Sequence, residues 1–174
     1  RIAAAVLLAG SAMAANAAVN LSVNSFAYGG NSVNVVATGT TPATYSGGAG
    51  AFAGSLSGAG IFDSPSFITY CVEVEQSFSW GNLTGYTLVS PAAFTQASPA
   101  ENGWGPNAVA IGNRLGQLLT YALPTATTSA NSTALQLAIW NTVYDTDNTL
   151  SGGAFADTSG FAAQANAYLA NSLS

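Results

Sequence analysis

The spacing of apolar residues gives the first part of the chain a strand-like pattern. Polar and apolar residues alternate at 19–28 and at 32–36, on either side of the pair Gly29-Gly30. This arrangement predicts a β-hairpin that turns at the two glycines. The stretch 38–60 is rich in Gly, Ala, Thr and Ser and has little periodicity. We expect it to form a long loop or weak edge strands.

The second part of the chain has apolar residues at helical spacing. The first predicted helix covers 106–123 and ends at Pro124, because proline cannot continue a helix. A second helix follows a polar linker, and Asn131 or Ser132 is expected to cap its N-terminus. A third helix is predicted over 158–173.

Strands followed by helices predict an α+β fold in one domain over 18–174. In this prediction residues 18–90 are β-rich and residues 104–173 are helical. The length of 174 residues is sufficient for a sizeable core.

The N-terminal stretch 1–17 has the pattern of a signal peptide remnant. Arg1 is a basic flank, 2–14 is a short Ala-rich apolar run, and small residues suited to cleavage follow. The alternatives are a transmembrane helix or an N-terminal core helix. We expect export, with a mature chain that begins near Ala15 or Ala18.

The charge of the chain excludes several classes of partner. Charged residues make up only 5% of the sequence, the formal net charge is −5, and the only basic residues are Arg1 and Arg114. No basic patch can therefore neutralise nucleic-acid phosphates, and anionic lipid is disfavoured for the same reason. A chain low in charge and rich in small polar residues is typical of secreted surface proteins.

The sequence offers little conventional catalytic chemistry. It contains no histidine and one cysteine, which excludes Ser-His-Asp and Cys-His catalysis and a structural zinc site. Asp145, Asp147 and Thr149 have the alternate spacing of a calcium loop, but the distal Glu of that motif is absent. Glu73 and Glu75 lie on one face of a predicted strand and form the acidic pair that an exported hydrolase would use. We expect solvated residues at both places, and neither a cofactor nor a metal.

One cysteine and one glutamine remain as candidate functional residues. Cys71 lies in the alternating stretch 67–74, which predicts a strand, and it has no second cysteine to pair with. Gln136 lies in an apolar, helix-patterned run, where a primary amide is unusual. A thiol and a carboxamide can condense into an internal thioester with loss of ammonia. The alternative is that Gln136 satisfies backbone groups of a neighbouring strand while Cys71 packs as a small buried thiol.

The two segments resemble the paired motifs of the bacterial thioester domain, also called the TQXA domain. The segment 70–73 (YCVE) is similar to its aromatic-Cys strand motif, and 135–140 (LQLAIW) is similar to its apolar-Gln helix motif. Leu135 stands where the family's short name has Thr. The resemblance covers roughly residues 67–145 and is strongest to the version in secreted PEP-CTERM proteins. The sorting tail of those proteins is not in this sequence.

The resemblance implies both a fold and a function. The implied fold is a β-sandwich or barrel with a helical subdomain, and a thioester between them with the sulfur from Cys71 and the acyl carbon from Gln136. The implied function is covalent capture of an amine, from a surface protein's lysine or from a polyamine, by a secreted adhesin or matrix crosslinker. Each bond forms once, so the protein is not expected to be an enzyme.

Two other functions remain open at this point. One is a noncovalent, self-associating protein of the extracellular matrix or cell surface, and the other is the exported hydrolase. A membrane connection is expected only through a C-terminal anchor outside this sequence.

Overall fold

The computed structural model describes residues 18–38, 43–74, 78–87, 107–145 and 147–172. The predicted signal peptide therefore lies outside the described residues. The described elements are, in chain order, β1 (Ala18–Phe26), β2 (Asn31–Ala37), β3 (Ala43–Ala49), β4 (Phe52–Ser57), the 3-10 turn η1 (Gly60–Phe62), β5 (Ser64–Thr69), β6 (Gly81–Thr87), α2 (Ala108–Ala122), α3 (Ser129–Tyr144), β7 (Phe155–Asp157) and α4 (Ala162–Asn171).

The fold is mixed α+β, as the order of strands and helices predicted. The described strands form two antiparallel sheets and no closed barrel. One is a four-stranded sheet in the order β5-β4-β1-β6, and the other is a three-stranded sheet in the order β3-β2-β7. The strand β7 lies in the part of the chain predicted to be helical, between α3 and α4.

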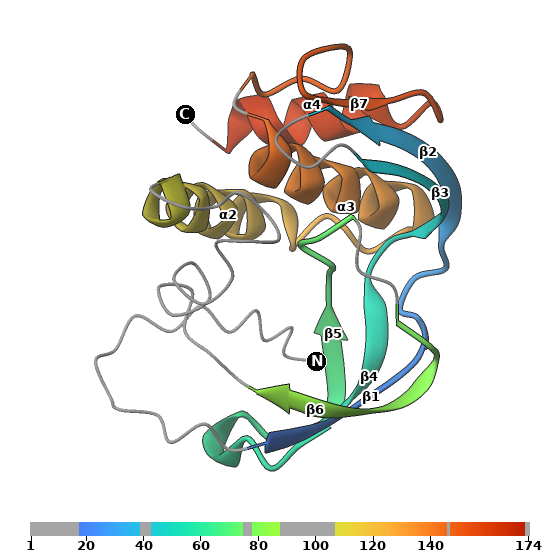
Figure 1. Ribbon diagram of the computed structural model, residues 1–174, viewed down its shortest axis with the longest axis vertical. Helices are drawn as coiled ribbons and strands as arrows, with labels where there is room; N and C mark the ends of the chain where they lie inside the picture. Colours follow the sequence, from blue (N-terminus) through green and yellow to red (C-terminus); the bar gives the residue numbers. More distant parts are fainter. Residues whose placement is uncertain (1–17, 39–42, 75–77, 88–106, 146, 173–174) are drawn as a thin grey trace.

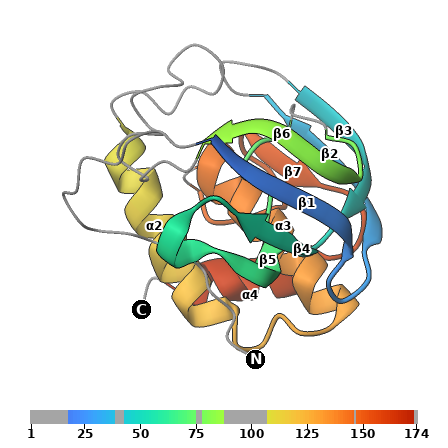
Figure 2. The same cartoon turned by 90° about the horizontal axis from the view of Figure 1, so that it is seen from below.

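The helices are associated with the three-stranded sheet. In Figure 1, α2, α3 and α4 lie in the upper part of the molecule with β2, β3 and β7, and the four-stranded sheet lies below them. Figure 2 shows the same molecule from below, with the four-stranded sheet in front of the helices. The main cluster of buried apolar residues is formed by the helices, the three-stranded sheet and the segment that follows β5.

The predicted hairpin at Gly29-Gly30 is wrong. Instead of pairing with β2, β1 pairs with β4 and β6, while β2 pairs with β3 and β7. The chain thus passes from one sheet to the other across the glycines and reverses only between β2 and β3. A Cβ atom on Gly30 would lie 2.6 Å from the ring of Phe26. Gly30 therefore allows the ring of Phe26 to pack closely against the backbone at this bend, and it does not form a hairpin turn.

The prediction of a loop or weak edge strands over 38–60 is only partly correct. The strand β3 is at the edge of its sheet, but β4 is an interior strand between β5 and β1. A Cβ atom on Gly54 of β4 would lie 1.6 Å from the carbonyl oxygen of Ser22 on β1. The small residues that hid this strand from the sequence pattern allow its backbone to approach β1 closely.

The helices α2 and α4 start later than the patterns predicted, and α3 starts earlier. The helix α2 ends just before Pro124, as expected. The cap of α3 is Thr128, whose hydroxyl accepts a hydrogen bond from the backbone N–H of Asn131 (3.2 Å), so the predicted caps Asn131 and Ser132 are inside the helix. The helix α4 is shorter at both ends than the predicted 158–173.

Candidate functional site

Among the described elements, the helix α3 is the most buried. Every residue from Ser132 to Val143 is buried. The helix contacts α2, α4, β2, β3 and β7, so it has neighbours on all sides. A helix with this environment has no face for solvent, which explains why its apolar residues are not confined to one face.

A stripe of polar side chains on α3 faces backbone groups of the surrounding chain. The hydroxyl of Ser132 accepts a hydrogen bond from the backbone N–H of Ala51 (2.7 Å), and the hydroxyl of Thr133 donates to the carbonyl of Ala49 (2.9 Å). Gln136 continues the stripe one turn further along. The spacing of these three residues is visible in the sequence, where Ser132 was expected only as a helix cap.

The segment that follows β5 runs along the same helix. The prediction that Cys71 lies on a strand is wrong, because β5 ends two residues before it. The hydroxyl groups of Tyr70 and Ser132 are 3.4 Å apart, and the backbone N–H of Val74 donates to the hydroxyl of Tyr144 (3.1 Å). Contacts at both ends therefore hold the segment against α3.

Gln136 and Cys71 meet in the middle of this contact. The backbone N–H of Cys71 donates to Gln136 Oε1 (3.0 Å), and Gln136 Nε2 donates to the carbonyl oxygen of Cys71 (2.7 Å). Gln136 is fully buried, and Cys71 is partly buried. Gln136 lies in the middle of α3, because the helix starts before the predicted caps Asn131 and Ser132. The two hydrogen bonds fix the carboxamide beside the residue that carries the thiol.

The thiol of Cys71 is in a poor environment for a negative charge. Burial, with a smaller contribution from the negative charge of Glu73, raises the pKa of Cys71 to about 11. The thiol is therefore protonated at neutral pH and is a weak nucleophile in its resting state. Any acyl transfer to this sulfur requires removal of the thiol proton.

The structure describes only one residue of the predicted acidic pair, Glu73. Glu73 is 6% exposed and lies outside the strand, so the expectation of a solvated strand residue is wrong for it. Glu75 lies outside the described residues. Within the described part of the chain, no group of three or more His, Cys, Asp or Glu side chains is arranged to hold a metal ion.

The two aspartates with the spacing of a calcium loop, Asp145 and Asp147, organise the connection from α3 to β7. Asp145 accepts hydrogen bonds from the backbone N–H groups of Ala154 and Phe155, the latter at 3.0 Å. Asp147 accepts from the backbone N–H of Thr149 (3.0 Å). These carboxylates bind backbone groups of their own loop, which is a structural role.

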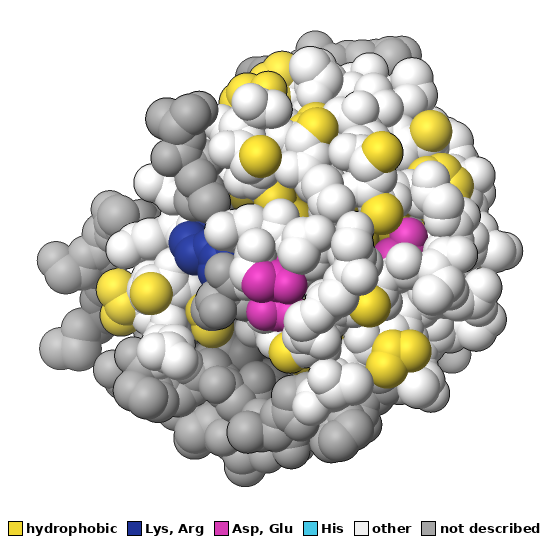
Figure 3. Space-filling view, turned by 90° about the horizontal axis from the view of Figure 1, so that it is seen from above, with side chains coloured by type: hydrophobic (Ala, Val, Ile, Leu, Met, Phe, Trp, Pro, Cys, Tyr) yellow, Lys and Arg dark blue, Asp and Glu magenta, His cyan; other side chains and the backbone are white. Residues whose placement is uncertain are grey.

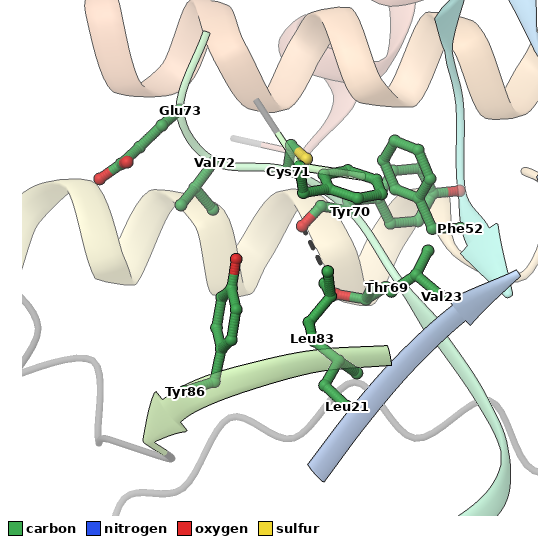
Figure 4. A pocket seen from close by; sticks show the side chains of 11 residues that line it. Leu21, Val23, Phe52, Thr69, Tyr70, Cys71, Val72, Glu73, Leu83 and Tyr86 are labelled. Carbon is green, nitrogen blue, oxygen red and sulfur yellow. Dashed lines mark hydrogen bonds between the residues drawn. The ribbon is translucent and has the colours of Figure 1, made fainter. Parts of the chain in front are cut away.

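Two pockets meet at Cys71. The first, the sheet pocket, has a volume of about 210 Å³ and lies between the segment after β5 and the strands β1 and β6. Figure 4 shows Val72 pointing into this pocket toward Tyr86, with Leu21 and Leu83 on the strands, and Glu73 turned away from them. The pocket walls are mostly apolar.

The second pocket, the aromatic pocket, has a volume of about 340 Å³. Cys71 and Glu73 line it together with six aromatic residues, Phe26, Tyr45, Phe52, Phe78, Trp80 and Trp140. Gln136 lines neither of these two pockets. Of the two residues of the candidate site, Cys71 is the one that borders these pockets.

The described surface carries few charges. Figure 3 shows one face that is largely neutral, with one small basic area beside an acidic one and scattered apolar side chains. No helix in the described ranges is long and apolar enough to cross a membrane.

Comparison with known proteins assigns no family to this chain. The sequence matches no known family model, and neither curated proteins nor solved structures give a significant match. The resemblance to thioester domains is therefore a hypothesis carried by two short motifs. The geometry around Cys71 and Gln136 is the basis of the function proposed below.

Proposed function

We propose that this protein is a secreted surface or matrix protein that captures amines covalently through an internal thioester between Cys71 and Gln136. The observation that carries the proposal is the pair of hydrogen bonds between the Gln136 carboxamide and the backbone of Cys71. They bring together two residues that are 65 positions apart in the chain. The only cysteine of the sequence thus lies beside the carboxamide of a fully buried glutamine.

The hydrogen bond to Gln136 Oε1 favours the chemistry of bond formation. The sulfur of Cys71 attacks the amide carbon of Gln136, and the carbonyl electrons move onto Oε1. The N–H of Cys71 already donates to this oxygen and stabilises the negative charge that develops there. When the carbonyl re-forms, the amide nitrogen leaves as ammonia and takes the proton that the thiol loses.

In capture the sulfur of Cys71 becomes the leaving group, while the acyl carbon of Gln136 is again the electrophile. An amine attacks the same carbon, the C–S bond breaks, and the sulfur leaves with a proton from the amine. The product has an amide at position 136 and a free thiol at Cys71. Since the thioester is consumed, each molecule reacts once, and the protein is not an enzyme.

The burial of Gln136 slows the competing reaction with water. Because the side chain is fully buried, water has poor access to its carbon before an amine arrives. The proposed targets are amines on a surface protein or a polyamine. The low charge of the chain favours neither nucleic acid nor anionic lipid as a partner.

The second candidate is a noncovalent structural protein of the matrix or cell surface. It is favoured by the same two hydrogen bonds, because they satisfy the carboxamide and remove the cost of burying it. In this account Gln136 acts as a structural amide that ties the segment after β5 to α3. The two candidates differ in whether the amide nitrogen is still present in the mature protein.

Methylamine uptake tests the proposal. Fresh protein is incubated with methylamine and mapped by peptide mass spectrometry. We expect methylamine on Gln136 and a newly free thiol on Cys71. The variants Cys71→Ala and Gln136→Ala should take up none, while Gln117→Ala, which removes an exposed glutamine of α2, should react as the wild type does. The noncovalent candidate would be supported if Gln136 is unmodified in fresh wild-type protein and the protein does not react with methylamine.

A further inference from the structure

Aromatic rings form a connected cluster at the mouth of the aromatic pocket. Phe52 stacks on Phe26 with 5.0 Å between ring centroids, and Trp80 lies edge-on to Phe26 at 5.3 Å. Phe78 contacts both Phe52 (5.0 Å) and Trp80 (5.6 Å). Trp80 is 53% exposed although it is the largest ring of the cluster, so a ligand from solvent can reach it.

Two further aromatic rings line the pocket. Tyr45 and Trp140 are in edge-to-face contact at 5.5 Å, and both line the pocket. The pocket is therefore bounded by rings from β1, β3, β4 and α3, and from the segment that includes Phe78 and Trp80. Ring faces carry partial negative charge, which attracts cations.

The charged groups at the pocket favour the same kind of ligand. Among the described residues, Glu73 is the only acidic residue that lines it, and Arg114, the one basic residue in those ranges, does not line it. The chain as a whole is negative, with a net charge of −5. An anion would be repelled by the ring faces and the carboxylate, while an organic cation would be attracted by both.

We propose that the aromatic pocket binds an alkylammonium group noncovalently. The rings contact the alkyl substituents and attract the positive charge, and the Glu73 carboxylate adds to that attraction. This binding does not require a thioester. Its consequence for capture rests on the proposed function: since the pocket also borders Cys71, it would hold the charged end of a diamine or polyamine while the other, uncharged amine attacks.

Binding of tetramethylammonium tests the proposal separately from the thioester. This cation has no N–H group, so it cannot open a thioester, and its failure to bind would leave the methylamine result unaffected. We expect a saturable upfield shift of its methyl proton signal on addition of the wild-type protein, because the ring faces shield a bound methyl group. The uncharged molecule tert-butanol, of similar size, should show no saturable shift.

Three variants locate the binding site. Trp80→Leu should weaken tetramethylammonium binding roughly fivefold, because it removes the exposed ring. Glu73→Gln, which keeps the size of the side chain, should weaken it about threefold. Tyr121→Leu removes an exposed ring of α2 outside the pocket and should bind as the wild type does. Circular dichroism confirms that each variant is folded.

The proposal fails if the wild type shows no saturable shift or binds tert-butanol as well as tetramethylammonium. It also fails if a folded Trp80→Leu protein keeps the wild-type affinity. Should Trp80→Leu not fold, Glu73→Gln and the comparison with tert-butanol give the decision.

Discussion

The surroundings of α3 and the four-stranded sheet are packed very differently. The main buried cluster contains residues of all three described helices and of the three-stranded sheet, but none of the four-stranded sheet. The four-stranded sheet has its own small set of buried residues, among them Val19, Val23, Phe52 and Leu56. The sheet pocket separates part of this sheet from the segment that carries Cys71.

The candidate site lies where these two regions meet. On one side of Cys71, α3 holds Gln136 fixed by packing and by hydrogen bonds. Cys71 also lines the sheet pocket and the aromatic pocket, and Trp80 of the aromatic pocket is exposed to solvent. A reactive bond needs both a rigid electrophile and an access path, and the difference between the two regions supplies them.

The largest expected effect comes from removing the link between the two regions. Closing a loop of 65 residues with a covalent bond stabilises a fold by about 4 kcal/mol in the chain-entropy estimate. Opening the thioester with methylamine should therefore lower the free energy of unfolding by about that amount, measured by urea denaturation. The opened wild type should then match Cys71→Ser, and treatment of Cys71→Ser should change nothing. Equal stability before and after treatment would contradict the crosslink.

Truncation of one leucine in each region tests the difference in packing. Leu137 of α3 is fully buried, while Leu83 of β6 is partly exposed and borders the sheet pocket. Leu137→Ala should cost about 3 kcal/mol of unfolding free energy, and Leu83→Ala about 1 kcal/mol. Equal losses would show that the four-stranded sheet is packed as tightly as the helical core.

A glycine substitution tests how the four-stranded sheet is held together. Gly54→Ala places a methyl group against the carbonyl of Ser22 and should cost about 2 kcal/mol through displacement of β4 from β1. Gly152→Ala is the matched control, because no atom lies within 4 Å of the added methyl group. Thermal unfolding of both variants gives the comparison. If Gly54→Ala is as stable as the control, the two strands are not in close contact there.

The smallest expected effect is a loss of stability at alkaline pH in protein with a free thiol. Burial raises the pKa of Cys71 from its ordinary 9.0 to about 11, so the unfolded chain releases the thiol proton first. The contribution of the protonated thiol to the free energy of unfolding is fully present below pH 9 and is lost as the pH rises through 11. The loss is about 1 kcal/mol by pH 10. Methylamine-opened wild type should show this loss in urea denaturation and Cys71→Ser should not, while Tyr70 titrates in both. Identical pH profiles would contradict the burial of the thiol.

The sequence pattern predicted the fold class and the approximate positions of the helices. Proline and apolar periodicity are local signals, so α2 could be placed between Pro106 and Pro124 with an error of only a few residues. The pairing of β1 with β4 could not be predicted in this way. It depends on close backbone approach at Gly54 and on ring packing over Gly30, and the sequence shows only glycines that are equally typical of turns.

The candidate site was partly visible in the sequence. A lone cysteine and an amide in an apolar helix are unusual residues, which drew attention to Cys71 and Gln136. The hydrogen bonds between them depend on the path of the chain after β5, which leaves the predicted strand and follows α3. The aromatic pocket was not predicted, because its rings come from distant parts of the chain.

The intact mass of freshly prepared protein tests the central claim most directly. The account predicts a mass one ammonia below that of the sequence, with the deficit located by peptide mapping to a link between Cys71 and Gln136. The deficit should be absent from Cys71→Ala. A full sequence mass in fresh wild-type protein, with Gln136 unmodified and Cys71 free, would contradict the thioester and leave the noncovalent matrix protein as the function.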